Sequence, residues 1–430
     1  MTYAWPPSRE FWNDEFPAKT DARTAPHLFK GLIPSSAASP SDVLGGFTAI
    51  RHAYAADTQT KAKARVYVGE ERRDDLLPEV LTASAWPEGG FVKWMQSVVD
   101  AERFSLVINN LETVSPPLAK GLGTFLASLF DGWGVPLGGA EQVAFAGNYA
   151  GTAFGVHEGY EDAFLIHLGP GTKNFYTWPG GEYEKLTGGT GPLYGDYRWL
   201  LKHGRHFVLE PGDALFLPRR VFHVGTQNEF SVSVAVPLYT YPDAGLMRQA
   251  ILPELLDSLL ADRGPDDERS QPSPMASQAE GDGPVAQRLA HLAHTTLTTA
   301  AEQAEEAVEQ HVRQRWETVL SNGGWELAED DLSRSLAAAA FDARDVKPGA
   351  TASLVPPYRL RVAGERVFLR GFQIAIDAHV LEADMVSALN AGASVPLPHD
   401  DNVLAAVRAL GATGGLKVTT RSTASEDPTA

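Results

Sequence analysis

Short apolar runs recur between Gln142 and Tyr241, and each is bounded by Gly, Pro or Asn. Closely spaced runs of this kind, with turn signals between them, are typical of an all-β barrel or sandwich. The tripeptide Pro211-Gly212-Asp213 indicates a tight turn between two of these strands. The hydrophobic pattern therefore predicts a mainly β core in the middle of the chain, made from VAFAGNYA, AFLIHLG, KNFYTW, HFVLEPGDALFLP and SVSVAVPLYTY.

Helical periodicity marks the segments on both sides of this core. Apolar residues at helical spacing predict a helix over 117–133, another over 245–262, and a long third from 284 to about 320. Residues 263–283 are polar and rich in Pro, Ser and Gly, which predicts a flexible loop. The apolar stripe of the long helix indicates core packing or a dimer seam, and we expect a homodimer.

The two ends of the chain differ in character. The first hundred residues mix Pro, Trp and short amphipathic pieces, which predicts a partly helical lead-in packed on the barrel. The last hundred predict two strands, two helices and a closing strand, an order typical of a winged-helix module. We therefore divide the chain into a lead-in over 1–100, a barrel over 101–243, a helical segment over 244–330, a winged-helix-like module over 331–418 and a tail over 419–430.

Composition narrows the chemistry and the location. The 430 residues include no cysteine, which excludes disulfides, thiolate zinc sites, iron–sulfur clusters and a cysteine nucleophile. A formal net charge of −18 argues against a generic nucleic-acid binder. No segment has the ~18 consecutive apolar residues of a membrane span. The N-terminus lacks the basic start and apolar run of a secretory signal, so we expect a cytoplasmic protein.

Two histidines are the sharpest candidates for chemistry. His157 precedes a strongly apolar strand, and His223 follows another. A barrel can bring two strand-end histidines together at its mouth, and imidazole nitrogen suits iron(II). A carboxylate normally completes such a facial triad and leaves positions open for a cosubstrate and oxygen.

These segments resemble the JmjC and cupin-like oxygenases, especially the bacterial ribosomal-oxygenase type. The matching blocks are the strand-start His157, the GPGTK run that ends in Lys173, and PGDALFLPRRVFH with the distal His223. The strong resemblance covers roughly residues 104–241, and a weaker one extends over the helical and C-terminal segments. It implies a double-stranded β-helix with a helical dimerisation segment and a C-terminal winged-helix-like module.

The resemblance also implies cofactors and their binding residues. His157 and His223 would be ligands of Fe(II), and 2-oxoglutarate would be the cosubstrate. Lys173 would pair with the far carboxylate of 2-oxoglutarate, a role that suits a lysine as a point cation. Asn148 and Tyr149 are further candidates to hydrogen-bond the same cosubstrate.

The chain departs from the family pattern at one position. The family motif is His-x-Asp or His-x-Glu, whereas this triplet is His157-Glu158-Gly159. One interpretation is that Gly159 leaves a gap for chloride or water, as in iron halogenases with His-x-Gly or His-x-Ala. In a second, Glu158, Glu161 or Asp162 supplies the oxygen ligand, and in a third the site is degenerate. Residues two apart on a strand face the same way, so Gly159 lies on the side of His157 and Glu158 points away from it. This favours the first interpretation, in which Gly159 leaves a gap at the metal.

Other polar residues have plainer interpretations. His203 and His206 are expected in a loop. His291 and His294, on the long helix, are expected to be polar residues of an interface. His167 is expected to contact the substrate or to support the residues that do, because it could face the barrel interior from its strand. Arg219 and Arg220 would contact either an acidic substrate or solvent.

The sequence thus predicts an iron and 2-oxoglutarate-dependent dioxygenase acting as a hydroxylase or a halogenase. Its substrate would be an amino-acid side chain in a peptide or protein, or a small molecule, and the acidic balance favours a basic partner. The main alternative is a catalytically degenerate cupin-like module that binds a peptide or protein. A transcription factor built on the C-terminal module is a weaker option.

Overall fold

The computed structural model describes residues 3–57, 63–69, 71–152, 154–261, 284–327 and 341–420. The contacts divide the chain into two compact units. The first unit comprises Met1–Thr240 with Glu317–Ala430, and the second comprises Tyr241–Trp316.

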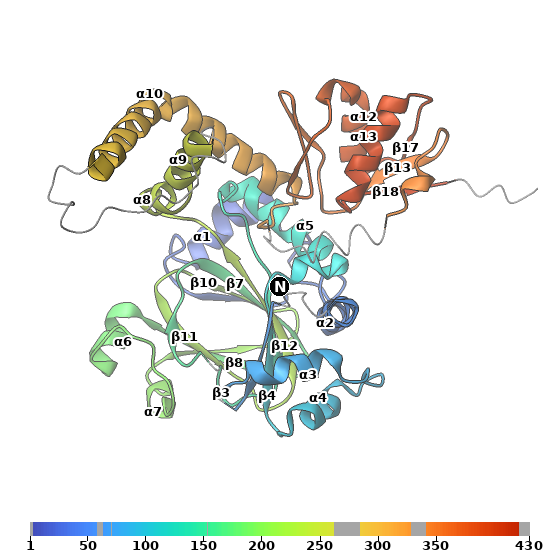
Figure 1. The fold of residues 1–430 in the computed structure, drawn as a ribbon. Helices are drawn as coiled ribbons and strands as arrows, with labels where there is room; N and C mark the ends of the chain where they lie inside the picture. The colour runs from blue at the N-terminus through green and yellow to red at the C-terminus, as the bar shows by residue number, and fades with distance from the viewer. Residues whose placement is uncertain are drawn as a thin grey trace, which may run out of the picture. The chain divides into compact units, whose positions relative to one another are not determined.

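Eight consecutive strands build the core of the first unit (Figure 1). They are β5 (Val143–Gly147), β6 (His157–Glu158), β7 (Asp162–Gly169), β8 (Lys173–Pro179), β9 (Arg205–Leu209), β10 (Ala214–Leu217), β11 (Val221–Thr226) and β12 (Ser231–Leu238). The larger sheet contains the order β10-β7-β12-β5, and the smaller sheet has the order β6-β11-β8-β9. Successive strands therefore alternate between the two sheets, except that β8 and β9 are consecutive and lie in the same sheet.

The pairing of these strands is nested. The first strand pairs with the eighth, the second with the seventh, the third with the sixth and the fourth with the fifth, all antiparallel. Nested pairing across two sheets defines a jelly roll. The predicted double-stranded β-helix is therefore confirmed by the topology itself.

The lead-in contributes strands as well as helices. Strand β1 (His27–Phe29) pairs with β10, and β2 (Ala64–Val68) and β3 (Glu71–Arg72) extend the large sheet beyond β4 (Phe104–Ile108), a strand just past the lead-in that pairs with β5. These strands are short, and hydrophobic periodicity does not reveal them. The helices before the barrel are η1 (Phe11–Glu15), α1 (Phe16–Lys19), α2 (Pro40–Ala56), η2 (Asp74–Leu76), α3 (Leu77–Thr82) and α4 (Phe91–Val99).

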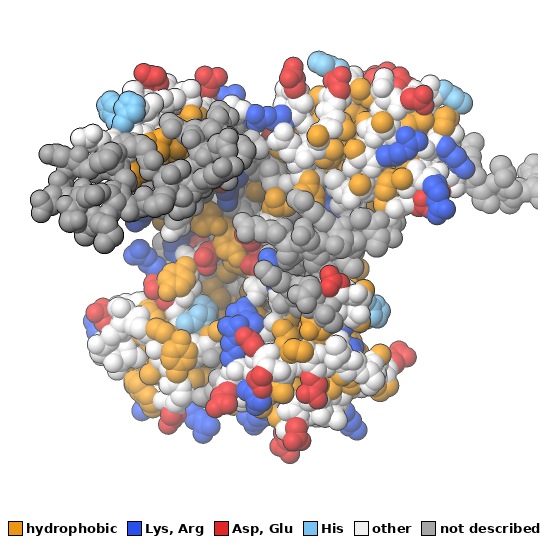
Figure 2. All heavy atoms as spheres, in the orientation of Figure 1, with side chains coloured by type: hydrophobic (Ala, Val, Ile, Leu, Met, Phe, Trp, Pro, Cys, Tyr) orange, Lys and Arg blue, Asp and Glu red, His pale blue; other side chains and the backbone are white. Residues whose placement is uncertain are grey.

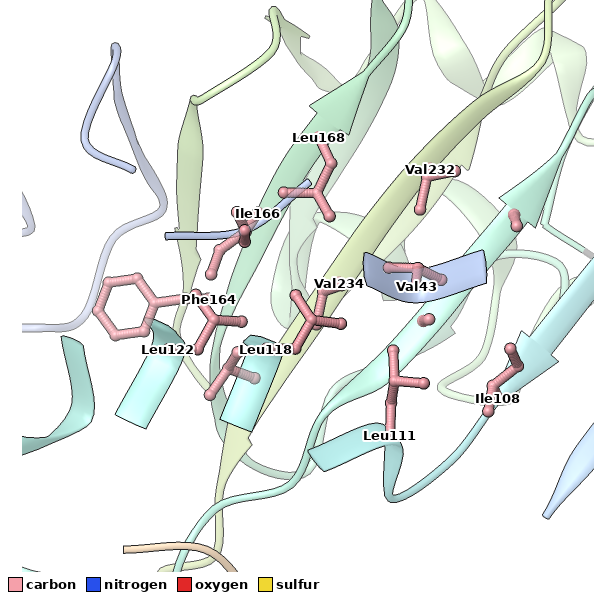
Figure 3. Close-up of a cluster of buried hydrophobic side chains, with 14 of the residues drawn as sticks. Val43, Ile108, Leu111, Leu118, Leu122, Phe164, Ile166, Leu168, Val232 and Val234 are labelled. Atoms are coloured by element: carbon pink, nitrogen blue, oxygen red, sulfur yellow. The ribbon is translucent and has the colours of Figure 1, made fainter. Parts of the chain in front are cut away.

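One face of the large sheet is packed against helices. Helix α5 (Pro116–Trp133), which matches the predicted helix over 117–133, follows the short turn η3 (Leu111–Thr113). Figure 3 shows Phe164, Ile166 and Val234 of the sheet together with Leu118 and Leu122 of α5, all of them fully buried. Because strand side chains alternate between faces, the residues between them in sequence face the other way, into the barrel.

A helical insertion flanks the small sheet. Helices α6 (Gly180–Thr187) and α7 (Arg198–Leu201) lie between β8 and β9 in sequence and beside β11 in space (Figure 1). Tyr183 of α6 stacks on Phe222 of β11, with ring centroids 3.7 Å apart and planes inclined by 5°. This stack fixes the insertion and its loop against the barrel.

The second unit is helical, as predicted. Helix α8 (Asp243–Leu246) continues through a π-helical turn, η4 (Met247–Ile251), into α9 (Leu252–Ala261), and α10 (Pro284–Ser321) is the long helix. The π turn comes just before Pro253, a residue that cannot donate to the helical ladder. Leu289 and Leu297 of α10 are exposed, so a dimer seam there stays a prediction. The predicted flexible loop over 263–283 lies outside the described residues.

The C-terminal segment has its own apolar core. The predicted helices and closing strand are present, and three short strands replace the two expected after Tyr358. Residues 331–340 and 421–430 of the predicted module and tail lie outside the described residues. The elements are η6 (Ala343–Asp345), β13 (Thr351–Leu354), β14 (Arg361–Ala363), β15 (Arg366–Leu369), β16 (Phe372–Ile374), η7 (Ala378–Val380), α12 (Ala383–Asn390), β17 (Val395–Pro396), α13 (Asp401–Ala412) and β18 (Leu416–Thr419).

Two properties of the surface bear on partners. Within the described ranges, no helix combines the length with the apolar character that a membrane crossing requires. Basic and acidic side chains are interspersed over the visible face of the barrel (Figure 2), despite the net charge of −18.

Candidate metal centre and its cavity

The two candidate ligand histidines lie directly opposite each other on a pair of adjacent strands. His157 on β6 is the direct antiparallel partner of His223 on β11. Their ring centroids are 4.4 Å apart, and the ring planes are inclined by 60°. Directly paired residues project their side chains to the same face of a sheet. This single strand pairing brings together two imidazoles that are 66 positions apart in the sequence.

The hydrogen bonds of both rings leave the same nitrogen available. Nδ1 of His157 lies 3.1 Å from the carbonyl oxygen of Gly155, and Nδ1 of His223 lies 3.0 Å from that of Val221. A carbonyl only accepts, so each Nδ1 carries the proton and each Nε2 keeps its lone pair. A backbone carbonyl that orients the ring through its other nitrogen is the usual support of a metal-binding histidine.

Both histidines are held in the neutral form. Burial lowers the pKa of His157. Burial, followed by the neighbouring His157, lowers the pKa of His223 to about 3. Neutral imidazole is the form that binds a metal, so the pair needs no deprotonation at ordinary pH.

Gly159 lies beside this pair, where a third ligand would be expected. A Cβ atom built on Gly159 would be 3.3 Å from Cε1 and 3.8 Å from Nδ1 of His223. The amide of Gly159 donates to the carbonyl of Val221, and its own carbonyl accepts from the amide of Arg220 at 2.7 Å. The backbone is therefore fixed with its missing side chain directed at the imidazoles.

Within the described part of the chain, the structure does not bring a carboxylate to the two histidines to complete a metal-binding group. Among the described residues, no group of three or more His, Asp or Glu side chains could hold a metal ion. Glu158 and Glu161 line the cavity without completing such a group. Asp162 accepts from the backbone amide of Arg219 at 2.9 Å and pairs with its guanidinium at 3.4 Å.

Lys173 lies at the same cavity as the histidines but on β8. Its side chain is buried, with 1% of the residue exposed, and Nζ donates to Tyr149 at 2.6 Å and to Gln227 at 3.2 Å. Burial lowers the pKa of Lys173 to about 7. Both of these partners are neutral oxygens, so an anion that entered the cavity would stabilise the charged form of the lysine.

Asn148 and Tyr149 follow β5, and their side chains have different surroundings. Tyr149 is buried and holds Nζ of Lys173 through its hydroxyl group. Asn148 accepts from the backbone amide of Phe104 at 3.0 Å and donates to the carbonyl of Glu102 at 2.8 Å. The structure therefore brings Tyr149 to the lysine and ties Asn148 to the backbone beyond the end of β5, and neither residue is among those that line the cavity.

The cavity between the two sheets has a volume of about 550 Å³. Its rim includes Tyr160 and Tyr194, whose side chains are 78% and 65% exposed. The interior wall is largely apolar, with contributions from Val143, Phe145, Leu165, Phe175, Leu217 and Ala235. The volume falls within the range of roughly 300 to 1,000 Å³ that is typical of small-molecule sites.

The remaining histidines do not join the centre. His167 is buried, with Nδ1 3.0 Å from Ser233 Oγ and Nε2 3.1 Å from the carbonyl of Gly171, so it supports the turn before Lys173. His206 lies on β9, not in a loop, with Nε2 2.8 Å from Asn174 Oδ1. The other candidates, His203, His291 and His294, are exposed.

A polar cluster on the opposite wall was not predicted from the sequence. Arg65, Asn109, Glu141 and Tyr239 all line the cavity. They lie on or beside β12, β5, β4 and β2, which are adjacent to one another in that order in the large sheet. No local motif marks these residues, because each is a single polar side chain on or at the end of a strand.

The sequence matches no protein-family model and no curated protein. Similar solved structures include an X-ray structure of Escherichia coli ycfD, with a TM-score of 0.48 and 14% identity, covering 95% of this chain and 98% of that one. A structure of the E. coli ribosomal oxygenase YcfD has a TM-score of 0.48 and 16% identity, covering 92% and 94%. Another, of YcfD in complex with cobalt and 2-oxoglutarate, has a TM-score of 0.47 and 16% identity, covering 92% and 95%. Likeness at this level carries no argument about activity, so the interpretation of the site rests on its own geometry.

Proposed function

We propose that this protein is an iron(II)- and 2-oxoglutarate-dependent oxygenase that functionalises an unactivated C–H bond. One observation carries the proposal: the unbonded Nε2 atoms of His157 and His223 share a cavity with the buried, unneutralised Lys173. Imidazole nitrogens suit iron(II), and a buried lysine suits one end of a dicarboxylate.

The residues present fit both groups. His157 and His223 would hold the metal, and Lys173 would receive the far carboxylate of 2-oxoglutarate. When bound together, iron, 2-oxoglutarate and oxygen supply the oxidant that removes hydrogen from carbon. The chain's own contribution is position: carbonyls orient both imidazoles, while Tyr149 and Gln227 hold Nζ of Lys173 in place. The apolar wall excludes water from the reacting carbon.

Gly159 decides between two outcomes of this chemistry. It brings no side chain to the position beside His223, where a Cβ atom would lie only 3.3 Å from Cε1, so any ligand there would have to be external. We propose that chloride takes this place and that the product is a chlorinated carbon. Water in the same place would leave a hydroxylase.

The charge around the cavity bears on the substrate. Glu141, Glu158 and Glu161 line it, and the whole chain carries a net charge of −18. This balance favours a substrate with a basic group, either an amino-acid side chain in a peptide or protein or a small molecule.

Anaerobic titration with iron(II) and 2-oxoglutarate tests the proposal. We expect a metal-to-ligand charge-transfer band at one iron per chain, and succinate formation once oxygen is admitted. His223→Ala should abolish both. His206→Ala is the matched control, because this histidine lies on the same sheet outside the cavity lining. A normal band and normal succinate formation in His223→Ala would contradict the proposal.

A binding module without catalysis is the second candidate. The observation in its favour is that no third protein ligand accompanies the histidines in the described part of the chain. It predicts that anaerobic reconstitution leaves the chain without stoichiometric iron, whether or not chloride is present.

A further inference from the structure

A cation and an anion face the cavity on either side of one amide side chain. A guanidinium nitrogen of Arg65 donates to Oδ1 of Asn109, and Nδ2 of Asn109 donates to Oε1 of Glu141 at 2.8 Å. All three residues line the cavity. Asn109 is thus fixed in orientation by its two neighbours, and it keeps the guanidinium and the carboxylate apart.

The carboxylate of Glu141 is almost fully buried and is held in place by hydrogen-bond donors. Only 6% of the residue is exposed, yet its carboxylate has three donors. Oε1 also accepts from the backbone amide of Asn110 at 2.9 Å, and Oε2 accepts from the hydroxyl of Tyr239. A carboxylate has about four lone-pair sites, so three donors leave room for one more, such as an ammonium group in the cavity.

Arg65 is prepared as a cation. It pairs with Val107 on β4, and Val107 pairs with Phe145 of the cavity wall, so the three side chains share a face. Its guanidinium lies 5.6 Å from the centre of the Phe154 ring. No carboxylate pairs with Arg65 in the part of the chain that the structure describes; Asn109 and Tyr67 accept from its guanidinium, and the remaining N–H donors can meet a ligand.

The roles of the two cavity cations differ. Among the described lining residues, Arg65 and Lys173 are the two that belong to the Lys and Arg class. Lys173 lies on β8 of the small sheet and Arg65 on β2 of the large one. With Lys173 assigned to the cosubstrate, Arg65 remains for an anionic group of the substrate.

We propose that Arg65 and Glu141, spaced by Asn109, recognise the carboxylate and the ammonium group of a free α-amino acid. This inference rests on the proposed function and names its substrate class. The guanidinium of Arg65 and the carboxylate of Glu141 are separated by one amide side chain and two hydrogen bonds. This arrangement suits a ligand that carries its carboxylate and its ammonium group on the same carbon. Glu158 and Glu161 add negative potential that favours the ammonium end.

A residue inside a polypeptide fits this pair less well. Its backbone nitrogen and carbonyl are neutral, so a bound peptide would leave Arg65 desolvated without a counter-charge, which is costly. A basic side chain would satisfy Glu141 alone. The zwitterion is the ligand that neutralises both groups at once.

Binding of small probes tests the inference on the full-length chain. The twenty proteinogenic amino acids are titrated calorimetrically against metal-free protein and against protein loaded with zinc and 2-oxoglutarate. We expect at least one free amino acid to bind. Its N-acetyl and carboxamide derivatives should each bind about tenfold more weakly or worse, since each loses one charge-assisted contact.

Charge-specific variants assign each end of the ligand. Glu141→Gln should weaken binding of the free amino acid but not of its N-acetyl derivative. Arg65→Gln should weaken the free amino acid but not its carboxamide, and Arg65→Lys should restore part of the affinity. Arg72→Gln is the matched control, because Arg72 lies on neighbouring β3 in an exposed ion pair with Asp74.

Three results would overturn the inference. They are failure of every free amino acid to bind at millimolar concentration, equal binding of a doubly blocked amino acid, and equal loss for all derivatives in both variants, which would indicate a structural role. The zinc-loaded arm separates this test from the proposed function. If zinc and 2-oxoglutarate do not bind while an amino acid does, only the oxygenase proposal fails.

Discussion

The ammonium group of Lys173 donates a hydrogen bond of 2.6 Å to the hydroxyl group of Tyr149, in surroundings from which water is nearly excluded. A second bond of 3.2 Å reaches Gln227. Both acceptors are neutral, and burial brings the pKa of Lys173 down to about 7 from an ordinary 10.5. The lysine is therefore positioned for an anion but is only partly charged until one arrives.

This pKa makes 2-oxoglutarate binding depend on pH. Above about pH 7 the free site has lost its proton, so binding a dicarboxylate must take one up, and affinity should fall as pH rises. The dissociation constant should increase by up to about tenfold per pH unit between pH 7 and 9. Calorimetry on Lys173→Met should give weak, pH-independent binding, whereas Lys202→Met on the exposed surface should behave as wild type. A flat profile for the wild type would contradict the assignment of Lys173.

Substitution of Gly159 tests the external-ligand position. Gly159→Asp places a carboxylate beside His223 and should abolish dependence on chloride, so that any remaining product is hydroxylated. Gly159→Ala adds the same Cβ atom, 3.3 Å from the His223 ring, without the carboxylate. Product masses with and without chloride separate the effects. Loss of chlorination in both variants alike would point to crowding instead of ligation.

Glu112 should make stability depend on pH. It is buried, and burial followed by the charge of Glu141 raises its pKa to about 8 from an ordinary 4.5. The unfolded chain releases this proton above pH 4.5 while the native state retains it. Native stability is therefore lost as pH rises from about 4.5 to 8, by up to about 1.4 kcal/mol per pH unit.

Glu112→Gln removes this titration and keeps an oxygen for the backbone amide of Gln142. Its stability advantage over the wild type should be small near pH 4.5 and grow toward pH 8 in urea unfolding experiments. Glu79→Gln, at an exposed position on α3, is the control and should differ little from wild type at any pH. A pH-independent difference for Glu112→Gln would count against the raised pKa.

Phe164 should be among the costly positions of the core. Its ring is fully buried and contacts Phe125 and Phe216, with centroids 5.2 and 5.3 Å away. Phe164→Ala should reduce the free energy of unfolding by about 3 to 5 kcal/mol. Tyr160→Ala, at a side chain that is 78% exposed, should change it by less than about 0.5 kcal/mol. Chemical unfolding monitored by tryptophan fluorescence measures both.

Local pattern was sufficient for much of this protein. Short apolar runs predicted six of the eight barrel strands but missed β6 and β11, which carry the two histidines, and helical spacing predicted α5 and α10 to within a residue or two. The order of the motif blocks singled out His157, Lys173 and His223, which the structure brings to one cavity. The strands and helices follow from side-chain periodicity within a short stretch of sequence, whereas the roles of the three site residues came from the resemblance to a known family.

Tertiary structure decided which neighbours meet across the sheets. Asn148 and Tyr149 are adjacent in sequence and both can hydrogen-bond, yet only Tyr149 reaches Lys173, since consecutive side chains at a strand end diverge. Arg65, Asn109 and Glu141 have no shared motif and meet only because β2, β4 and β5 are adjacent in one sheet. Sheet order is set by long-range pairing and packing, which no short stretch of sequence encodes. The sequence by itself therefore determined most of the strands and singled out the two histidines and Gly159, and the fold alone decided what faces them across the cavity.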